Sequence, residues 1–322
     1  MSRPFDVVCV GAALVDVPLQ PVSRDIFDYD SYPLNQIAMT IGGDAINEST
    51  ILSRLGARVE LLSMVGDDAA GAYILKHCER EGIDYTGVQQ RAGIDTSINV
   101  GLISADGERS FVTNRNGSLW KLSIDDINQR LIARGSILSM ASIFNSPLLD
   151  NDAMVAIFKV AKAAGMTIVA DLIKPRLGET LDDIAEALSY VDYFFPNNAE
   201  AAYMTGKERD EDIADVIMSY GVRHLAMKVG RRGAYVCGLD MPGVIVPAMP
   251  GIVPIDTTGA GDNFASGFIT GLLEGLDPKE CAVYGNVAAS VAIESIGATT
   301  GITSREVFDE RLYAYRAQHG AH

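Results

Sequence analysis

Paired cysteines are absent from this sequence of 322 residues. Its four cysteines, Cys9, Cys78, Cys237 and Cys281, form no C-x-x-C pair, and only Cys78, next to His77, has a histidine beside it. This spacing excludes a zinc framework and a dense disulfide scaffold. We expect four buried free thiols in a reducing compartment.

Histidine is scarce as well, with four residues in the whole chain. His319 and His322 belong to the terminal stretch AQHGAH, which we expect to be frayed. His77 is expected on the surface of a helix, and His224 at the start of a strand. A carboxylate is therefore a better candidate than histidine for a general base.

The sequence also lacks basic charge and long apolar runs. Its 26 Lys and Arg against 42 Asp and Glu give a formal net charge of −16, which does not favour nucleic acid or an anionic membrane as a partner. No uncharged apolar run reaches the roughly 18 residues of a membrane span. The N-terminal stretch MSRPFDVVCVGAALVDV is interrupted by Asp6 and Asp16 and is expected to be a first strand rather than a signal peptide. We predict a cytoplasmic protein.

Strand-like and helical segments alternate along most of the chain. One clear unit runs from SILSMASIF through NDAMVAIFKVAKAAG to MTIVADL. Such alternation predicts an α/β fold, with a mostly parallel sheet and helices on both faces, in one domain over residues 1–322. The C-terminal third is predicted to be mostly helical, over residues 262–274, 278–295 and 304–316.

Two segments interrupt this pattern. Residues 17–40 contain three prolines and no helical period, whereas residues 96–113 alternate as strands around a hairpin turn at Asp106-Gly107. We expect residues 17–40 and 96–115 to form a small second sheet that serves as a lid, an oligomer interface or both. The alternative is an ordinary edge hairpin of the main sheet.

The stretch IDTTGAGDNFASGFITGLLEG, residues 255–275, places an acid on the first turn of an apolar helix. Gly259, Ala260 and Gly261 leave the backbone N–H groups of the helix start accessible to an anion. Asp262 beside that anion could take the proton of a hydroxyl that attacks a phosphate, or it could simply cap the helix. The residues alone support both equally, and Phe264 and Phe268 are expected to be core.

Motifs of several other enzyme classes are missing. The sequence contains no G-x-x-x-x-G-K-[ST], no G-x-S-x-G and no H-E-x-x-H. Its one G-x-G-x-x start, at Gly259, has Phe264 in the third glycine position. These absences exclude a P-loop NTPase and a dinucleotide-binding fingerprint.

Two long motifs carry a family resemblance. DTTGAGDNFASGF resembles the D-T-x-G-A-G-D-x-F-x-x-G signature of the ribokinase/pfkB carbohydrate kinases. IGGDAINESTILSRLGARVELLSMVGDDAAG resembles their N-terminal signature, and GGDAINE and TNRNGSLWKL are most similar to the YdjH-type sugar kinases. The resemblance implies a doubly wound ribokinase-like domain with a small β-sheet lid, a homodimer through that lid, and γ-phosphoryl transfer from ATP to a sugar hydroxyl.

The same resemblance assigns residues around the reacting groups. It makes Asp262 the catalytic base and the backbone of Gly259, Ala260 and Gly261 the anion hole. The positions that match sugar-binding residues of the family are Asp16, Gly42, Gly43 and Asn47. Alternatives remain for two of them, because Asp16 could be a solvent-exposed turn residue and Asn47 a helix cap.

Further positions match the nucleotide and ion sites of the family. Asn197 and Glu200 in PNNAE correspond to the pair that organises Mg²⁺ and the phosphates, mainly through water. The positions that match the nucleotide site are Lys228, Gly230, Gly233 and, in the adenine pocket, Asn286. Asp256 and Thr258 correspond to a monovalent-cation loop, so a potassium requirement is plausible.

Departures from the family pattern concern the substrate. Asn145 stands where many family members carry an acid, and DLIKPR replaces their D-x-N-x-R. Arg115 and Asn116 lie in the lid region that faces the sugar. We hypothesise an oxidised or extended sugar whose carboxylate pairs with Arg115 or Lys174. The alternative is that these cations contact only ATP phosphates or solvent.

Two other functions stay open. A nucleoside kinase of the same fold would need an aromatic face for a base, which Phe111 or Trp120 could provide. A non-catalytic sugar-binding regulator could have kept the fold, although the intact G-A-G-D argues against it.

Overall fold

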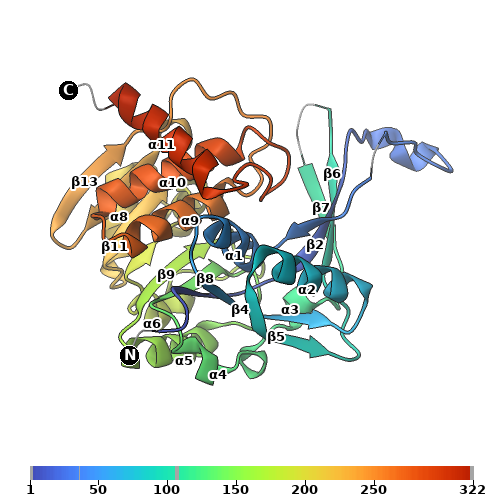
Figure 1. Ribbon diagram of the computed structural model, residues 1–322, viewed down its shortest axis with the longest axis horizontal. Helices are drawn as coiled ribbons and strands as arrows, with labels where there is room; N and C mark the ends of the chain where they lie inside the picture. Colours follow the sequence, from blue (N-terminus) through green and yellow to red (C-terminus); the bar gives the residue numbers. More distant parts are fainter. Residues whose placement is uncertain (1–2, 36, 106–108, 320–322) are drawn as a thin grey trace.

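A large twisted sheet forms the centre of the protein (Figure 1). The computed structural model describes residues 3–35, 37–105 and 109–319. The strands of this sheet are β1 (Val7–Val10), β4 (Val59–Gly66), β5 (Asp84–Arg91), β8 (Ile137–Ile143), β9 (Thr167–Leu172), β10 (Tyr193–Phe194), β11 (His224–Lys228), β12 (Ala234–Gly238) and β13 (Met241–Val246). Their order is β13-β12-β11-β10-β9-β8-β1-β4-β5, with parallel pairing from β11 to β5. Only β12 runs in the opposite direction and pairs antiparallel with both β11 and β13, so the predicted mostly parallel sheet is confirmed.

Helices cover both faces of the sheet, as predicted. Successive residues of β1 point to opposite faces: Val7 and Cys9 pack in one core, Val8 and Val10 in the other. The helices of the first face are α1 (Asp44–Arg54), α2 (Ala69–Glu81), α9 (Ala260–Leu273) and α10 (Pro278–Ala292), with α11 (Arg305–His319) packed outside them. Those of the second face are α5 (Asn151–Ala163), α6 (Ala185–Leu188), α7 (Asn198–Thr205) and α8 (Asp210–Ser219).

Several short helical turns complete the chain. They are α3 (Ser118–Lys121), α4 (Gln129–Ile132), η1 (Arg24–Asp28), η2 (Ile124–Asp126), η3 (Asp182–Ile184) and η4 (Gly230–Arg232). The three predicted C-terminal helices are present as α9, α10 and α11. The expectation of a frayed tail is wrong for residues 317–319, which continue α11; residues 320–322 lie outside the described part.

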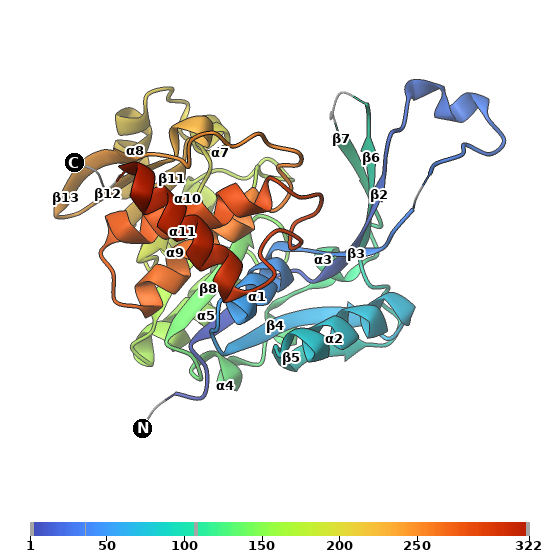
Figure 2. The ribbon, with the colours of Figure 1, turned by 45° about the horizontal axis from the view of Figure 1, so that its top comes forward.

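A second, smaller sheet stands beside the large one (Figure 2). It consists of β2 (Leu14–Leu19), β3 (Thr40–Gly42), β6 (Ile98–Ile103) and β7 (Arg109–Thr113), in the order β3-β2-β6-β7. The strands β6 and β7 pair antiparallel, with Val100 opposite Val112. The predicted second sheet is therefore confirmed and the alternative of an edge hairpin is wrong, whereas the turn at Asp106-Gly107 lies outside the described residues.

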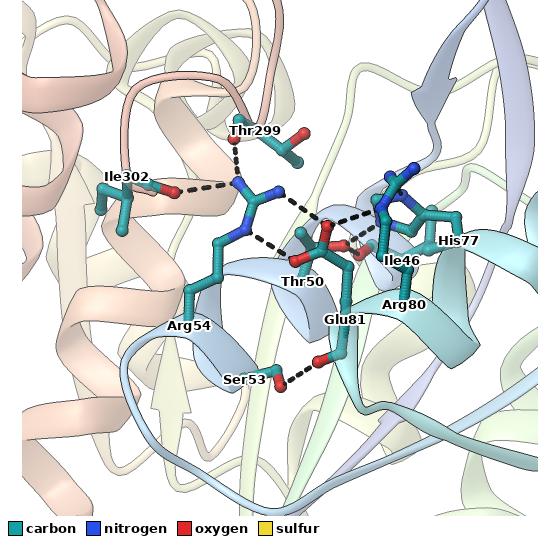
Figure 3. A network of polar contacts seen from close by, with 9 residues as sticks. All are labelled: Ile46, Thr50, Ser53, Arg54, His77, Arg80, Glu81, Thr299 and Ile302. Atoms are coloured by element: carbon teal, nitrogen blue, oxygen red, sulfur yellow. Dashed lines mark hydrogen bonds and ion pairs between the residues drawn. The ribbon is translucent and has the colours of Figure 1, made fainter. Parts of the chain in front are cut away.

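All four cysteines are free and buried, as expected. The prediction for His77 is wrong, because this α2 residue is only 4% exposed where α1 packs against it. Its Nε2 lies 2.9 Å from the Thr50 hydroxyl (Figure 3). Burial lowers the pKa of His77 to about 4, so its ring is neutral at pH 7. Among the described helices, none is both long enough and apolar enough to cross a membrane.

The topology fixes where a ligand site would form. From β1 the chain continues to β4 and β5 on one side, and β8 to β11 follow on the other. The strand order thus reverses between β1 and β8. In open α/β sheets, ligands bind at such a switch point, outside the carboxyl ends of the parallel strands.

Candidate active site

The helix α9 begins at the switch point without a side-chain cap. Its N-cap is Gly259, which has a φ of 73° and no side chain that could accept from the first-turn N–H groups. Asp262 therefore does not cap the helix, which resolves the alternative left open by the sequence. Its Oδ2 instead accepts a hydrogen bond of 2.8 Å from Nδ2 of Asn47.

Asn47 comes from α1, whose N-cap is Gly43 with a φ of 97°. Because Asn47 lies in the second turn, the alternative that it caps this helix is wrong. Its side chain is buried, and its Oδ1 has no hydrogen-bond partner among the described residues. A buried acceptor without a partner is costly, so this oxygen fits a donor from a bound ligand.

Asp16 lies on β2 of the small sheet, opposite Thr40, and not in a solvent-exposed turn. Burial raises its pKa to about 6, against a lowering hydrogen bond from Asn99. Within the described part of the chain its Oδ1 is a second buried acceptor without a partner. Gly42 permits this placement, because a Cβ there would lie 2.1 Å from Asp16 Oδ2.

Lys228 is the cation in a group of carboxylates from several elements. It ends β11 and forms an ion pair with Asp171 of β9, with side-chain exposures of 15% and 7%. Burial opposes its charge, but Asp171 and then Glu200 raise its pKa. The acids around it are Asp44, Glu48, Asp171, Glu200 and Asp262.

Burial is the first cause of a raised pKa in every one of these acids. For Asp262 the pKa lies well above its ordinary value, with further contributions from Asp44 and Glu48. The pKa of Glu200 is raised to about 7, and that of Glu48 to about 8. Groups shifted in this way at a switch point are typical of catalytic sites.

Asn197 and Glu200 meet at the start of α7, which follows β10. The Asn197 Oδ1 accepts from the Glu200 N–H at 2.9 Å, and Glu200 Oε2 accepts from the Asn197 N–H at 3.0 Å. This capping box uses one Glu200 oxygen and fixes its carboxylate near Lys228 and Asp171. The predicted magnesium role of Glu200 stays a prediction.

The loop after α10 closes over the start of α9. A Cβ on Gly259 would lie 2.5 Å from Cα and Cβ of Ala298. Asp256 connects this loop to the segment before α9. Its Oδ2 accepts from the Gly297 N–H at 2.9 Å, and its Oδ1 accepts from the N–H and the hydroxyl of Thr258. The monovalent-cation role of Asp256 and Thr258 stays a prediction.

Arg54 holds the same loop from the other end of α1 (Figure 3). It donates from Nη1 to the carbonyls of Ile302, at 2.9 Å, and Thr299. Its Nε and Nη2 donate to the Glu81 carboxylate at 2.8 and 3.0 Å. The helix that carries Asn47 is thus joined to the loop over Gly259. Arg54 is the arginine of the R-L-G in the N-terminal motif, so its position was visible in the sequence, although no role could be assigned to it there.

We expect Arg54→Met to lower the free energy of unfolding by about 3–5 kcal/mol, because it leaves two carbonyls without their donor and the Glu81 carboxylate with only the longer contact to Arg80. Urea denaturation followed by circular dichroism measures this loss. The control is Arg58→Met, which removes an arginine whose side chain is 58% exposed in its pair with Asp6. Equal destabilisation in both variants would contradict the assigned importance of Arg54.

Sequence reasoning assigned no specific role to four polar residues of the site. Asp44 is on the first turn of α1, and its Oδ2 accepts from Asn145 Nδ2 at 3.1 Å. Arg176 Nη2 in turn donates to Asn145 Oδ1 at 2.8 Å. The other two are Asp171 and Glu48. All four stand inside the quoted GGDAINE and DLIKPR stretches, so their residue types were visible in the sequence, whereas their contacts depend on tertiary packing.

The remaining predicted residues lie at the edges of the site. Lys174 is exposed, with its Nζ 4.4 Å from the ring centre of Tyr203. Arg115 and Asn116 are exposed in the turn after β7. Gly230 and Gly233 flank η4, both with positive φ. Asn286 of α10 is buried, and its Nδ2 donates to the carbonyls of Val246 and Pro247 at 3.0 Å each. Binding roles for these residues stay predictions.

Glu48 makes stability depend on pH. It is 1% exposed, and its Oε2 accepts from Ser139 Oγ at 2.5 Å. Since its pKa is raised on folding from 4.5 to about 8, the folded state holds a proton that the unfolded state releases. The contribution of this bound proton to the stability of the folded protein is complete below pH 4.5 and is lost as the pH rises to about 8.

We therefore expect Glu48→Gln to be more stable than the wild type at pH 9, by about 3–5 kcal/mol, and similar to it at pH 4.5. Glutamine keeps an acceptor for Ser139 and cannot ionise. Urea unfolding at several pH values gives the difference between the two proteins, and exposed Glu310→Gln serves as the control. A parallel pH dependence of Glu48→Gln and wild type would refute the assignment.

Comparisons with known proteins now identify the family. The pfkB family carbohydrate kinase model matches residues 5–305. The chain is 28% identical to 2-dehydro-3-deoxygluconokinase of Bacillus subtilis, covering 87% of this chain and 88% of that one. It is 29% identical to ribokinase of Haemophilus influenzae, with 82% and 85% covered.

Solved structures show the same fold. A putative ribokinase II from E. coli superposes with a TM-score of 0.83 at 21% identity, over 98% of this chain and all of that one. Arabidopsis thaliana ribokinase complexed with ribose and ATP superposes with a TM-score of 0.81 at 22% identity, over 97% and 99%. The fold is therefore ribokinase-like, and the chain belongs to the pfkB family of carbohydrate kinases.

Proposed function

We propose that this kinase transfers the γ-phosphoryl group of ATP to a hydroxyl of a sugar or sugar derivative, with Asp262 as general base. The observation that carries the proposal is the placement of Asp262. Its half-buried carboxylate, with a raised pKa, lies on the first turn of α9, a helix without a side-chain cap, at the switch point of the sheet.

Asp262 would act through Oδ1. Its Oδ2 accepts from Asn47, whereas Oδ1 accepts no hydrogen bond among the described residues. A substrate hydroxyl donating to Oδ1 would be aligned for attack and would lose its proton to that oxygen as the new O–P bond forms. A raised pKa improves the carboxylate as a proton acceptor.

The uncapped start of α9 would serve as the anion hole. The N–H groups at the start of α9, of which that of Ala260 also makes a long contact of 3.3 Å with the Thr257 carbonyl, would stabilise the charge that develops on the transferred group, and the helix dipole favours negative charge there. Lys228 adds a positive charge, since its Nζ would lie 3.2 Å from a Cβ placed on Gly261. That proximity also supports close approach of phosphate to this glycine.

The sugar would bind between the two sheets. Asp16 and Asn47 each hold a buried oxygen without a partner in the described part of the chain, and sugar hydroxyls are suitable donors for both. Gly42 and Gly43 let the backbone come close. The small sheet would then act as the lid, and its exposed Phe111 and Val112 support the predicted homodimer through the lid.

The residues present also fit a magnesium ion. Several carboxylates surround the single ammonium of Lys228, so the phosphates of ATP would require further positive charge. Glu200 would hold the ion through water, consistent with the waters that Mg²⁺ retains. When bound, the ion neutralises charge on the phosphates. Relatives support these ligands, since one solved ribokinase II contains ATP and Mg²⁺. Potassium beside Asp256 remains a proposal.

An ADP-release screen tests the function. We expect turnover with members of a panel of sugars and sugar acids, and loss of that turnover in Asp262→Asn. Assays with and without potassium test the cation loop. Turnover with nucleosides alone would favour the nucleoside kinase, and sugar binding without any turnover would favour the regulator.

A further inference from the structure

Two arginines from opposite sides of the candidate site lie against one indole ring. Trp120 of α3 has Arg115 Cζ 5.9 Å and Arg176 Cζ 5.5 Å from its ring centre. Arg115 follows β7 of the small sheet, whereas Arg176 follows β9 of the large sheet. The pair therefore bridges the two sheets at the mouth of the site.

The ring also offers a donor without a partner. The Trp120 Nε1 is buried and makes no hydrogen bond among the described residues. Two guanidinium groups and an indole N–H are all donors, and two like charges near one ring repel each other. An anion placed among them would satisfy the donors and remove the repulsion.

Asn145 leaves the charge of Arg176 available. The amide oxygen of Asn145 faces Arg176 and its amide nitrogen faces Asp44, at 2.8 and 3.1 Å. It thus separates a guanidinium from a carboxylate that would otherwise pair with it. Neither Arg176 nor Arg115 forms a salt bridge within the described residues; nearby Asp44 and Glu179 act on Arg176 only through their charge.

We propose that Arg176 and Arg115, on Trp120, bind a carboxylate of the substrate, so that the sugar acid class is preferred over neutral sugars. This inference rests on the proposed kinase activity. The acid would lie with its carboxylate at Trp120 and the reacting hydroxyl at Asp262, with Asp44 and Asn145 between them. A monoanion fits this site better than a phosphate dianion, because Asp44 and Asp16 are also close to the sugar.

This assignment differs from the sequence hypothesis in the residue that binds the carboxylate, which is Arg176 in place of Lys174. Lys174 and Arg176 are both exposed, but Lys174 lies over the ring of Tyr203 of α7. Arg176 lies over Trp120 and donates to Asn145, so we assign the selective contact to Arg176. The planar fork of arginine also matches a carboxylate better than an ammonium does. Lys174 becomes the competing candidate in the test.

The test compares kcat and KM for matched pairs of hexoses and their aldonic and uronic acids, with hexose monophosphates as a separate arm. We expect the wild type to prefer the acids. Arg176→Gln should raise KM for acids about 10- to 100-fold and leave neutral hexoses within a few-fold, because charge-assisted hydrogen bonds are lost. Arg115→Gln should act in the same direction, and Asn145→Asp should also weaken acid binding by neutralising Arg176.

Arg58→Gln is the matched control, since it removes an arginine at the opposite, amino-terminal end of β4. Equal use of acids and neutral hexoses by the wild type would overturn the proposal while leaving the kinase activity intact. So would a selective effect of Lys174→Gln in place of Arg176→Gln, or a preference for hexose monophosphates. An equal loss with both substrate types in Arg176→Gln would assign it a purely structural role.

Calorimetry without ATP separates the inference from the proposed function. Aldonic or uronic acids that bind the wild type, and bind Arg176→Gln about 10- to 100-fold more weakly, support the subsite even in a protein without turnover. Acids that are phosphorylated but bind both proteins equally would overturn it.

Discussion

Asp262→Asn is expected to lower kcat by about 10²–10⁴-fold, the usual contribution of a positioned general base. Asparagine keeps the size of the side chain and can still pair with Asn47, but it cannot accept the hydroxyl proton. Because Asp262 hydrogen-bonds to Asn47 and acts on Lys228 of the predicted nucleotide site only through its charge, ATP affinity should change little. Steady-state kinetics and titration with a fluorescent ATP analogue measure the two quantities separately.

The matched control is Asp277→Asn, an exchange of the same kind at the exposed N-cap of α10. Asparagine caps helices as well as aspartate, so kcat should stay close to that of the wild type. The pH profile adds a second readout. Burial, Asp44 and Glu48 raise the pKa of Asp262, so kcat of the wild type should fall with decreasing pH well above the range of an exposed aspartate. Near-normal turnover in Asp262→Asn would refute the mechanism.

Sequence alone predicted much of the fold because hydrophobic patterning is local. The alternation of strands and helices gave the parallel sheet, and the alternating residues 96–113 gave β6 and β7. Sequence could not decide between a cap and a base for Asp262, since both occur on the first turn of a helix. The structure excludes the cap, because Gly259 is the N-cap and Asp262 accepts from Asn47, 215 positions away in the chain, whereas the role of Asp262 as a base stays a proposal.

The errors and omissions have the same origin. His77 carries a polar ring on a helix with a polar face, so its burial follows only from the packing of α1 on α2. Arg176 stands one position beyond the arginine of the family motif, and its contacts with Asn145 and Trp120 depend on β8, β9 and α3 meeting in space. Sequence can identify such residue types, but their partners are a property of the tertiary structure.

Gly259 is important both for the stability of the fold and for the geometry of the proposed anion hole. Its φ of 73° is left-handed, and a Cβ at this position would lie 2.5 Å from Cα and Cβ of Ala298 and 2.8 Å from the Ala298 carbonyl oxygen. All three distances are below normal contact. We expect Gly259→Ala to lower the free energy of unfolding by about 2–5 kcal/mol, from positive φ and overpacking. Displacement of the N–H groups at the start of α9 should also lower kcat/KM by about 10²–10³-fold.

Gly275→Ala separates these two causes. Gly275 follows the same helix with nearly the same φ, 76°, but has no atom within 4 Å of its added Cβ. Its substitution should lower the free energy of unfolding by about 1–2 kcal/mol, from the positive φ alone, and should leave kcat/KM within a few-fold of the wild type. Urea denaturation and steady-state kinetics on both variants give the comparison. Equal losses of activity in the two variants would show that general destabilisation, and not the geometry of the anion hole, accounts for the effect of Gly259→Ala.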